Sequence, residues 1–256
     1  MQNKVIINAD DFGKTESCSK AIAEAFEQNL ISSTTAMANG AYIEKAFDLA
    51  EKNGFKDEVG IHIVLTEGVP LTEDIKNDPF FCENGVFHGR INRLKKPSKD
   101  EISHLESEII AQIKRLRDIG FTLSHADSHH HIHTDVFFIK VIKKVLKENG
   151  VNKIRSHRNF GQIRFYKKIV KDVFNGKLKS GGFLTAEKMG SFKDARDFPE
   201  TLKKHLTEIM VHPDFDKSGV LIDRTDWTSE FPIGYPLEKI KDYTDGLQFI
   251  SYNDLK

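Results

Sequence analysis

Cysteine is scarce in this chain of 256 residues, which contains only Cys18 and Cys82. So few cysteines exclude a disulfide scaffold and a cysteine-rich zinc module, and they suit a reducing compartment. An excess of charge is also missing, because 38 basic residues balance 38 acidic ones. No overall field therefore favours nucleic acid or an anionic membrane, and we expect neither as a partner. The basic stretch at 164–171 is interpreted as a solvated helix face.

Long hydrophobic runs are absent as well. The apolar stretch near Met1 is too short for a secretory signal, and no later run could span a bilayer. We therefore expect a cytoplasmic protein. The remaining composition, 39% hydrophobic and 30% charged, is that of a globular chain. Its length allows a sizeable core in one large α/β domain or in two small ones.

Short apolar runs alternate with amphipathic segments along the chain. Residues 5–9 form a β-branched run, and apolar side chains then recur at helical spacing from Cys18 to Phe26, with Thr15 as the expected N-cap. The alternation predicts a parallel sheet of about seven βα units, in one barrel-like α/β domain covering residues 1–256. Further strands are expected at 33–38, 59–65, 121–125, 153–156, 206–211 and 247–252, and further helices at 42–52, 98–119, 135–149 and 237–243.

Residues 66–97 interrupt this alternation. They contain Pro70, Pro79 and the turn signal Asn84-Gly85, with little periodicity, and we predict a loop excursion over one face of the domain. Ser98 and Glu101 then form a capping box that begins a strong helix, and Gly120 follows its end. Residues 159–199 are basic and contain glycine, but no regular pattern is evident in them.

Polar clusters follow four of the predicted strands. They are Asp10-Asp11, His62, the tract at 127–133, and His212. In parallel α/β sheets the ligand site lies beyond the carboxyl ends of the strands, so we expect these clusters to converge on one site.

Two adjacent carboxylates after a buried strand are costly unless they share a cation, and a divalent metal is the usual solution. One of Asp10 and Asp11 would then bind the ion and the other would handle a proton. The alternative interpretation is a solvated turn that caps the following helix. The match of 11–13 to a protein-kinase motif is a coincidence, because no Gly-rich loop, strand lysine or catalytic loop precedes it.

Histidine is abundant, and five of the eleven histidines lie at 125–133. Alternation in an extended strand would place His125, Asp127, His129, His131 and His133 on one side. Side chains two residues apart are about 6.6 to 7 Å apart along a strand, whereas ligand atoms lie about 2.0 to 2.2 Å from a zinc-like ion. The tract can therefore supply one or two metal ligands. The others would orient ligands, contact substrate or be structural histidines.

At these residues the sequence resembles the YdjC-like carbohydrate deacetylases, which include the ChbG-type chitooligosaccharide deacetylases. The motifs run in the family's order and span most of the chain. They are 5–13 (Val-Ile-Ile-Asn-Ala-Asp-Asp-Phe-Gly), 33–40 (Ser-Thr-Thr-Ala-Met-Ala-Asn-Gly), 60–66 (Gly-Ile-His-Ile-Val-Leu-Thr), 125–133 (His-Ala-Asp-Ser-His-His-His-Ile-His) and 208–213 (Glu-Ile-Met-Val-His-Pro).

The resemblance implies a distorted (β/α) barrel related to polysaccharide deacetylases, with one divalent metal ion, Mg²⁺ or Zn²⁺, bound by Asp11, His62 and His129. It also implies Asp10 as the catalytic base and His212 as the general acid. The candidates for orienting these groups or contacting substrate are Asp127, His131 and Arg155. The resemblance fades at 158–197 and 227–243, which leaves the substrate open.

The expected reaction is metal-dependent hydrolysis of the N-acetyl group of N-acetylated sugars, such as chitobiose-type N-acetylglucosamine oligosaccharides. A metal-dependent phosphoesterase is the alternative enzyme, although it would need more cationic groups than Arg155 and Arg158 near the site. A non-catalytic sugar- or metal-binding protein is the alternative of a different class. A homodimer is an ordinary expectation for such a barrel.

Overall fold

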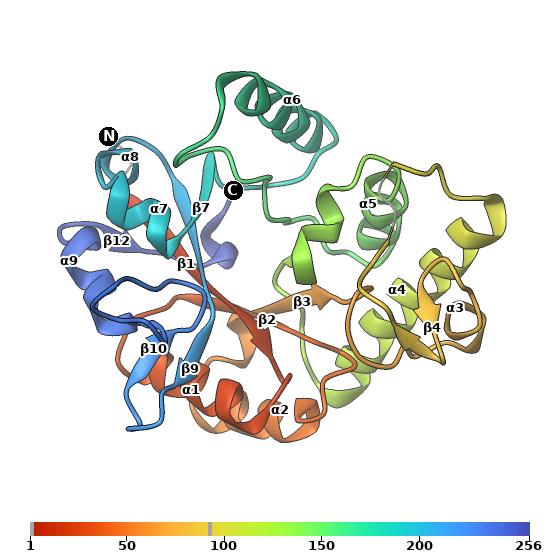
Figure 1. The fold of residues 1–256 in the computed structure, drawn as a ribbon, viewed down its shortest axis with the longest axis horizontal. Helices are drawn as coiled ribbons and strands as arrows, with labels where there is room; N and C mark the ends of the chain where they lie inside the picture. Colours follow the sequence, from red (N-terminus) through yellow and green to blue (C-terminus); the bar gives the residue numbers. More distant parts are fainter. Residues whose placement is uncertain (1–2, 92–93) are drawn as a thin grey trace.

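The computed structural model describes residues 3–91 and 94–256, so the first two residues of the apolar N-terminal stretch and two residues of the 66–97 excursion lie outside it. Its centre is a parallel sheet of seven strands in the order β6-β3-β2-β1-β8-β7, with β12 beside the start of β1 (Figure 1). The strands are β1 Lys4–Phe12, β2 Ser33–Ala36, β3 Val59–Ile63, β6 Ala126–Ser128, β7 Lys188–Ser191, β8 Thr207–Val211 and β12 Gln248–Phe249.

Strand β1 is the middle of this sheet, because apolar residues from Val5 onward bury both of its faces. It pairs with β8 along Val5 to Ala9, and with β2 from Asn8 onward. The register with β2 shifts between Ala9 and Phe12, and Asp11 inside this interval has a φ of 73°. The carboxyl end of β1 is therefore irregular at the point where the two aspartates lie.

Helices cover the outside of the sheet, and their apolar sides form one core with the strands. The expected caps are present: Thr15 accepts from the backbone of Cys18, and Ser98 forms a capping box with Glu101. The helices are α1 Glu16–Glu27, α2 Ile43–Lys52, α4 Lys99–Ile119, α5 Ile139–Glu148, α6 Phe165–Ser180, α7 Phe192–Asp197, α8 Glu200–Lys204, α9 Ile240–Thr244, and the 3-10 turns η1 Lys56–Glu58, η2 His129–Thr134, η3 Leu237–Lys239 and η4 Tyr252–Asp254.

The sheet curls into an open barrel, which confirms the predicted distorted (β/α) barrel. Between β6 and β7 only single parallel bridges are formed, Ala126 with Ile154 and Lys153 with Leu184. The strand predicted at 153–156 is therefore wrong in extent, because it has bridging partners at two residues only.

The strand predicted at 121–125 is also wrong. Leu123 has a φ of 60°, which interrupts an extended chain, and pairing with β3 begins at Ala126 opposite Ile61. The pairing ends at Ser128 opposite Ile63, where β3 itself ends. The length of β6 is therefore set by its partner, and the histidine tract leaves the sheet after three residues.

The excursion at 66–97 contains α3 Glu73–Lys76 and a small hairpin of β4 Cys82–Glu83 and β5 Val86–Phe87, turning at the predicted Asn84-Gly85. The buried carboxylate of Glu108, on α4, anchors it by accepting from the backbone N–H groups of Leu71 and Thr72 and from the hydroxyl of Thr72. These contacts fix the excursion at Leu71, eight residues after β3 ends at Ile63.

The chain after β8 forms a second small sheet, antiparallel, in the order β11-β10-β9. It begins directly after His212. Its strands are β9 Pro213–Phe215, β10 Leu221–Asp223 and β11 Tyr235–Pro236.

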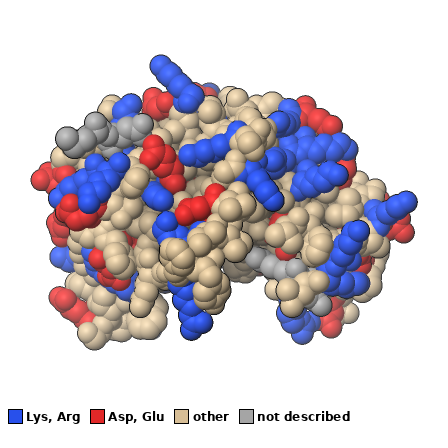
Figure 2. Space-filling view, turned by 90° about the horizontal axis from the view of Figure 1, so that it is seen from above, with Lys and Arg blue, Asp and Glu red and all other residues tan. Residues whose placement is uncertain are grey.

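The unassigned stretch at 159–199 contains α6, β7 and α7. Helix α6 stands apart from the sheet at the top of Figure 1, and Figure 2 shows Lys and Arg side chains in several groups on the face seen from that side. Its outer side is only partly the solvated charged face expected at 164–171, because Phe165, Tyr166 and Val170 are also exposed. No helix in the described ranges has the length and apolar character needed to cross a membrane.

We predict that Glu108→Ala lowers the free energy of unfolding by about 3 kcal/mol, because buried donors of the excursion lose their acceptor. Urea denaturation would measure the change. Glu106→Ala, which removes only a partly exposed ion pair with Lys144, should cost about 1 kcal/mol or less. Equal losses in the two variants would contradict the anchoring role.

Candidate functional site

A cavity of about 350 Å³ lies at the carboxyl ends of the central strands. It brings together the five residues predicted from the sequence: Asp10, Asp11, His62, His129 and His212. The other residues that line it are Lys14, Glu67, Ser128, His130, His131, Met210, Arg224 and Thr225.

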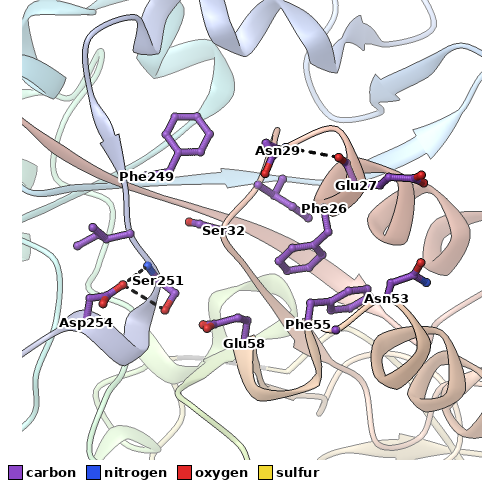
Figure 3. A pocket seen from close by; sticks show the side chains of 13 residues that line it. Phe26, Glu27, Asn29, Ser32, Asn53, Phe55, Glu58, Phe249, Ser251 and Asp254 are labelled. Carbon is purple, nitrogen blue, oxygen red and sulfur yellow. Dashed lines mark hydrogen bonds between the residues drawn. The ribbon is translucent and has the colours of Figure 1, made fainter.

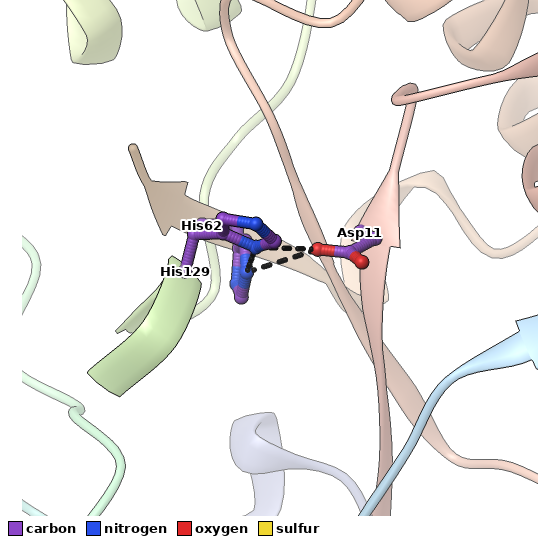
Figure 4. Close-up of side chains that lie close together, drawn as sticks. All are labelled: Asp11, His62 and His129. Atoms are coloured by element: carbon purple, nitrogen blue, oxygen red, sulfur yellow. Dashed lines mark hydrogen bonds and ion pairs between the residues drawn. The ribbon is translucent and has the colours of Figure 1, made fainter. Parts of the chain in front are cut away.

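Asp11, His62 and His129 come from the end of β1, from β3 and from the start of η2. Figure 4 shows the carboxylate of Asp11 facing both imidazoles. Oδ1 of Asp11 lies 2.9 Å from Nδ1 of His129 and 3.3 Å from Nε2 of His62, and these two nitrogen atoms are 3.3 Å apart. All three side chains are buried, and three possible ligand atoms form one compact triangle.

The triangle has the size that a bound metal ion requires. Ligand atoms at about 2.0 to 2.2 Å from one ion are roughly 2.8 to 3.6 Å apart at octahedral or tetrahedral angles. Within the described residues, Oδ1 of Asp11 makes no hydrogen bond of acceptable geometry, so a buried charged oxygen is left for a cation. Two imidazoles and a carboxylate suit zinc, and they also suit magnesium when water fills the remaining positions.

The outward nitrogen of each imidazole is bonded to a carboxylate, the arrangement that orients metal-binding histidines. Nδ1 of His62 lies 2.6 Å from Oδ1 of Asp127, and Nε2 of His129 lies 2.8 Å from Oε2 of Glu67. Lys14 Nζ is 2.8 Å from the same Glu67 oxygen. The sequence analysis missed Glu67, and its only signal was a carboxylate close behind the strand that carries His62.

Arg155 lies at the centre of the ion pairs beneath the cavity and is fully buried. Its guanidinium donates to both carboxylate oxygens of Asp10, at 2.7 and 2.6 Å. It also lies 2.7 Å from Oδ2 of Asp127 and donates to Oε1 of Glu208 at 2.7 Å. Tyr252 donates to the other oxygen of Glu208. Arg155 therefore binds three carboxylates at once, and it does not reach the cavity as a substrate-binding residue.

The carboxyl groups respond differently to these surroundings. Burial raises the pKa of Asp10, but the charge and hydrogen bonds of Arg155 outweigh it and hold that pKa well below its usual range. Burial also raises the pKa of Asp11, and the contacts with His129 and His62 lower it further than burial raises it. For Glu208 burial dominates over Arg155, and its pKa is raised. Both aspartates in the cavity are therefore carboxylates at neutral pH.

His212 follows β8 and lies on the cavity wall beside Asp10, with 3.8 Å between its Nε2 and Oδ2 of Asp10. Its Nδ1 lies 3.1 Å from the hydroxyl of Thr225. The neighbouring Arg224 forms an ion pair with Oδ2 of Asp11. The sequence analysis missed Arg224 and Thr225, because they lie outside the motifs that carry the family resemblance, the last of which ends at Pro213.

The predicted alternation of the histidine tract is wrong beyond Ser128. His130 and His131 have left-handed backbone conformations in η2, with φ of 53° and 54°, so side chains no longer alternate. His131 lines the cavity, and burial, followed by the charge of Arg155, lowers its pKa to about 3. His125 instead stacks on Tyr252 at 3.8 Å between ring centroids, outside the cavity.

A larger cavity, of about 480 Å³, lies beside the segments that precede β2 and β3 (Figure 3). Phe26, Phe55 and Phe249 line it together with polar side chains, and its titratable groups are Glu27, Glu58 and Asp254. No histidine or basic residue is among its described lining residues, so the smaller cavity is the candidate site.

The parallel strands form an open barrel, and a carboxylate and two imidazoles converge at the carboxyl ends of these strands. The protein is therefore an α/β barrel with a candidate metal site at the mouth of the barrel. Within that class, the chain belongs to the YdjC-like family: the model of the YdjC-like protein matches residues 4–236. The predicted family is confirmed.

Two relatives agree with this assignment, and one solved structure shares the fold. The chain is 36% identical over 148 residues to a carbohydrate deacetylase of Vibrio campbellii, and 29% identical over 223 residues to one of Listeria monocytogenes. These alignments cover 58% and 83% of this chain, and 57% and 82% of those proteins, so the chain spans little more than half of the first relative. A protein of Enterococcus faecalis, with cellobiose-phosphate cleavage as its suggested role, has a similar fold, with a TM-score of 0.74, 20% identity and 98% of each chain covered.

We predict that zinc affinity rises about tenfold per pH unit between about pH 6 and 8. Burial disfavours the His62 imidazolium, but the carboxylates of Asp127, Asp11 and Asp10 outweigh burial and raise its pKa to about 10 in the metal-free protein. An ion that takes Nε2 must therefore displace a proton, and this cost shrinks as pH rises towards that pKa.

Isothermal titration calorimetry in buffers of different ionisation enthalpy would measure both the affinity and the proton release. Replacing His205, which is partly exposed and paired with Glu187 outside the cavity, by Gln should leave the pH slope unchanged. Binding without proton release over this range would contradict the assignment of His62.

We predict that Arg155→Met lowers the free energy of unfolding by about 3 to 5 kcal/mol, because three buried carboxylates lose their shared cation. Thermal and urea denaturation would measure it. Arg158→Met removes a pair with Asp194 in which the arginine side chain is 37% exposed, and should cost about 1 kcal/mol. A loss below that of the control would show that Arg155 is not needed to hold the network.

Proposed function

We propose that this protein hydrolyses the N-acetyl group of N-acetylated sugars with the help of one divalent metal ion. The observation that carries the proposal is the convergence of Asp11, His62 and His129 in a cavity that also contains Asp10 and His212. Its relatives named carbohydrate deacetylases support the same reaction.

The three converging residues would hold the ion, which when bound would polarise the acetamido carbonyl and lower the pKa of a water molecule. Asp10 would take the proton of the attacking water. Arg155 and Asn8 fix its carboxylate: Arg155 donates to both oxygens and Asn8 Nδ2 donates to Oδ1 at 3.0 Å. The ion pair with Arg155 weakens Asp10 as a base, but it fixes the direction from which the proton is taken.

His212 would protonate the departing amine. Without a proton donor, the nitrogen would have to leave as an anion, which is prohibitively unfavourable at neutral pH. Nε2 of His212 lies 3.8 Å from Oδ2 of Asp10 and both residues line the same cavity, which supports their proposed roles as acid and base. A proton gained by Asp10 could then return through His212 for the next turnover.

N-acetylglucosamine oligosaccharides of the chitobiose type are the substrates that we propose to test first. The cavity volume of about 350 Å³ suits one acetamido sugar residue, and the remaining residues of an oligosaccharide would extend along the opening. Glu67 at the cavity wall offers carboxylate oxygens for sugar hydroxyls.

A phosphoesterase is less well supported by the arrangement of charges. Arg155 is buried with three carboxylates, and Arg158 is paired with Asp194, so neither is placed to bind a phosphate. Lys14 and Arg224 do line the cavity, but each is already paired with a carboxylate, Lys14 with Glu67 and Arg224 with Asp11. The other possible ligand groups among the described residues share His62 or His129 with the first, which favours one ion over a two-metal site.

We predict that Asp10→Asn lowers kcat for acetate release from N,N′-diacetylchitobiose at least about 100-fold, because the amide cannot accept the proton of water. Zinc affinity should change by less than about threefold, since Asp10 is not among the proposed ligands. Coupled acetate assays and calorimetry would measure the two effects. Asp57→Asn, on the exposed surface, is the matched control.

The wild-type protein should lose acetate release on chelation and regain it with Zn²⁺ or Mg²⁺. If the metal binds but no acetylated sugar in a panel is hydrolysed, the deacetylase proposal fails. That result would favour a non-catalytic binding protein or, if phosphate esters are cleaved, a phosphoesterase.

A further inference from the structure

The segment 223–225, at the end of β10, lies against His212 because of the second sheet. Antiparallel pairing sets Asp223 opposite Pro213, the residue after His212. The backbone N–H of Arg224 donates to the carbonyl of His212 at 3.1 Å, and the N–H of His212 donates to Oδ1 of Asp223 at 3.3 Å. The main chain of His212 is therefore held on both sides by this segment.

A chain of side-chain hydrogen bonds continues from this segment to the imidazole. The hydroxyl of Thr225 lies 2.8 Å from Oδ1 of Asp223 and 3.1 Å from Nδ1 of His212. A carboxylate can only accept, and a threonine hydroxyl has one proton, so the hydroxyl donates to Asp223. Its oxygen must then accept from His212, which requires a proton on Nδ1.

We propose that Asp223, acting through Thr225, holds His212 in the tautomer with its proton on Nδ1. Both are positioning residues. The inference deepens the proposed function and rests on it for its catalytic consequence, but the tautomer itself follows from the hydrogen-bond directions alone.

The tautomer matters because it determines which ring nitrogen of His212 can accept or donate a proton in the cavity. With Nδ1 bonded to Thr225, the neutral imidazole presents a free lone pair on Nε2, the nitrogen that lies 3.8 Å from Asp10. The protonated imidazole presents an N–H there, while the bond to Thr225 stays in place. His212 can therefore gain and lose a proton at Nε2 without turning its ring.

A local turn accounts for only part of this arrangement. Oδ1 of Asp223 also accepts from the backbone N–H of Thr225 at 2.9 Å, as in an ordinary turn closed by an aspartate. Such a turn needs neither the threonine hydroxyl nor the imidazole. The contact between the hydroxyl and His212 is what distinguishes a positioning role from local structure.

Long-range ¹H–¹⁵N NMR of the full chain, loaded with Zn²⁺ and labelled with ¹⁵N-histidine, tests the tautomer directly. At a pH where His212 is neutral, its Nδ1 should have a pyrrole-type shift and its Nε2 a pyridine-type shift, with the signals assigned by His212→Gln. In Thr225→Val the neutral ring should become a mixture of tautomers, and in Thr225→Ser it should remain as in the wild type.

Kinetics on diacetylchitobiose should follow the tautomer. We expect Thr225→Val to lower kcat on the order of tenfold with KM within about twofold, and Thr225→Ser to stay within about twofold of the wild type. Thr228→Val is the matched control, since its hydroxyl accepts from Phe231 further along the same loop.

A wild-type ring protonated on Nε2, or a Thr225→Val spectrum like that of the wild type, would overturn the inference. So would a shifted tautomer with unchanged kcat. If the tautomer shifts as expected but neither the wild type nor any variant releases acetate, the hydrogen-bond relay stands and the proposed function fails.

Discussion

One buried guanidinium holds together the interior of this barrel. Arg155 binds Asp10 on β1, Asp127 on β6 and Glu208 on β8 with its whole side chain out of solvent. A buried charge is tolerated only when partners with good geometry satisfy it, and here each of three charged partners depends on the same cation. The arginine between the strands therefore offsets the charge of three carboxylates that would otherwise be buried close to one another. Arg155 itself belongs to no strand, and the neighbouring residues 153 and 154 form only isolated β-bridges. This segment therefore contributes to the sheet mainly through the side chain of Arg155.

The same guanidinium connects the two halves of the candidate chemistry. It fixes Asp10, the proposed base, and it also binds Asp127, which orients His62 towards Asp11. The proposed base and the proposed metal ligand His62 are thus both held in place by Arg155. The residues near the cavity opening are held in place by a different segment. His212 and Asp11 contact the segment 223–225, which the small antiparallel sheet positions. The cavity therefore lies between the buried ion pairs of Arg155 and the segment 223–225 of the small antiparallel sheet.

The sequence predicted the site better than the elements that carry it. The convergence of the polar clusters could be predicted because polar residues behind apolar strands meet at one edge of a parallel sheet. The choice of Asp11, His62 and His129 among them came from the family resemblance. The histidine tract was predicted in the wrong conformation, because β6 ends where β3 ends, and local alternation contains no information on the length of a partner strand. Glu67 and Arg224 could not be predicted, since they reach the cavity only through the packing of the excursion and of the second sheet. Arg155 was predicted to orient other groups or contact substrate. Its three carboxylate partners could not be predicted, because positions 10, 127 and 208 are far apart in the sequence and no local pattern connects them.

The roles of Asp10 and Asp11 depend on a break in the strand that carries them. Adjacent side chains of a regular strand point to opposite faces, so two neighbouring carboxylates would not meet in one cavity. The register shift after Ala9 and the φ of 73° at Asp11 interrupt this alternation, and both carboxylates line the same cavity. A left-handed conformation is costly for a residue other than glycine, and such cost is tolerated where the surroundings fix it and function requires it. The strain at Asp11 is thus the structural condition for a proposed metal ligand and a proposed base to be neighbours in the sequence.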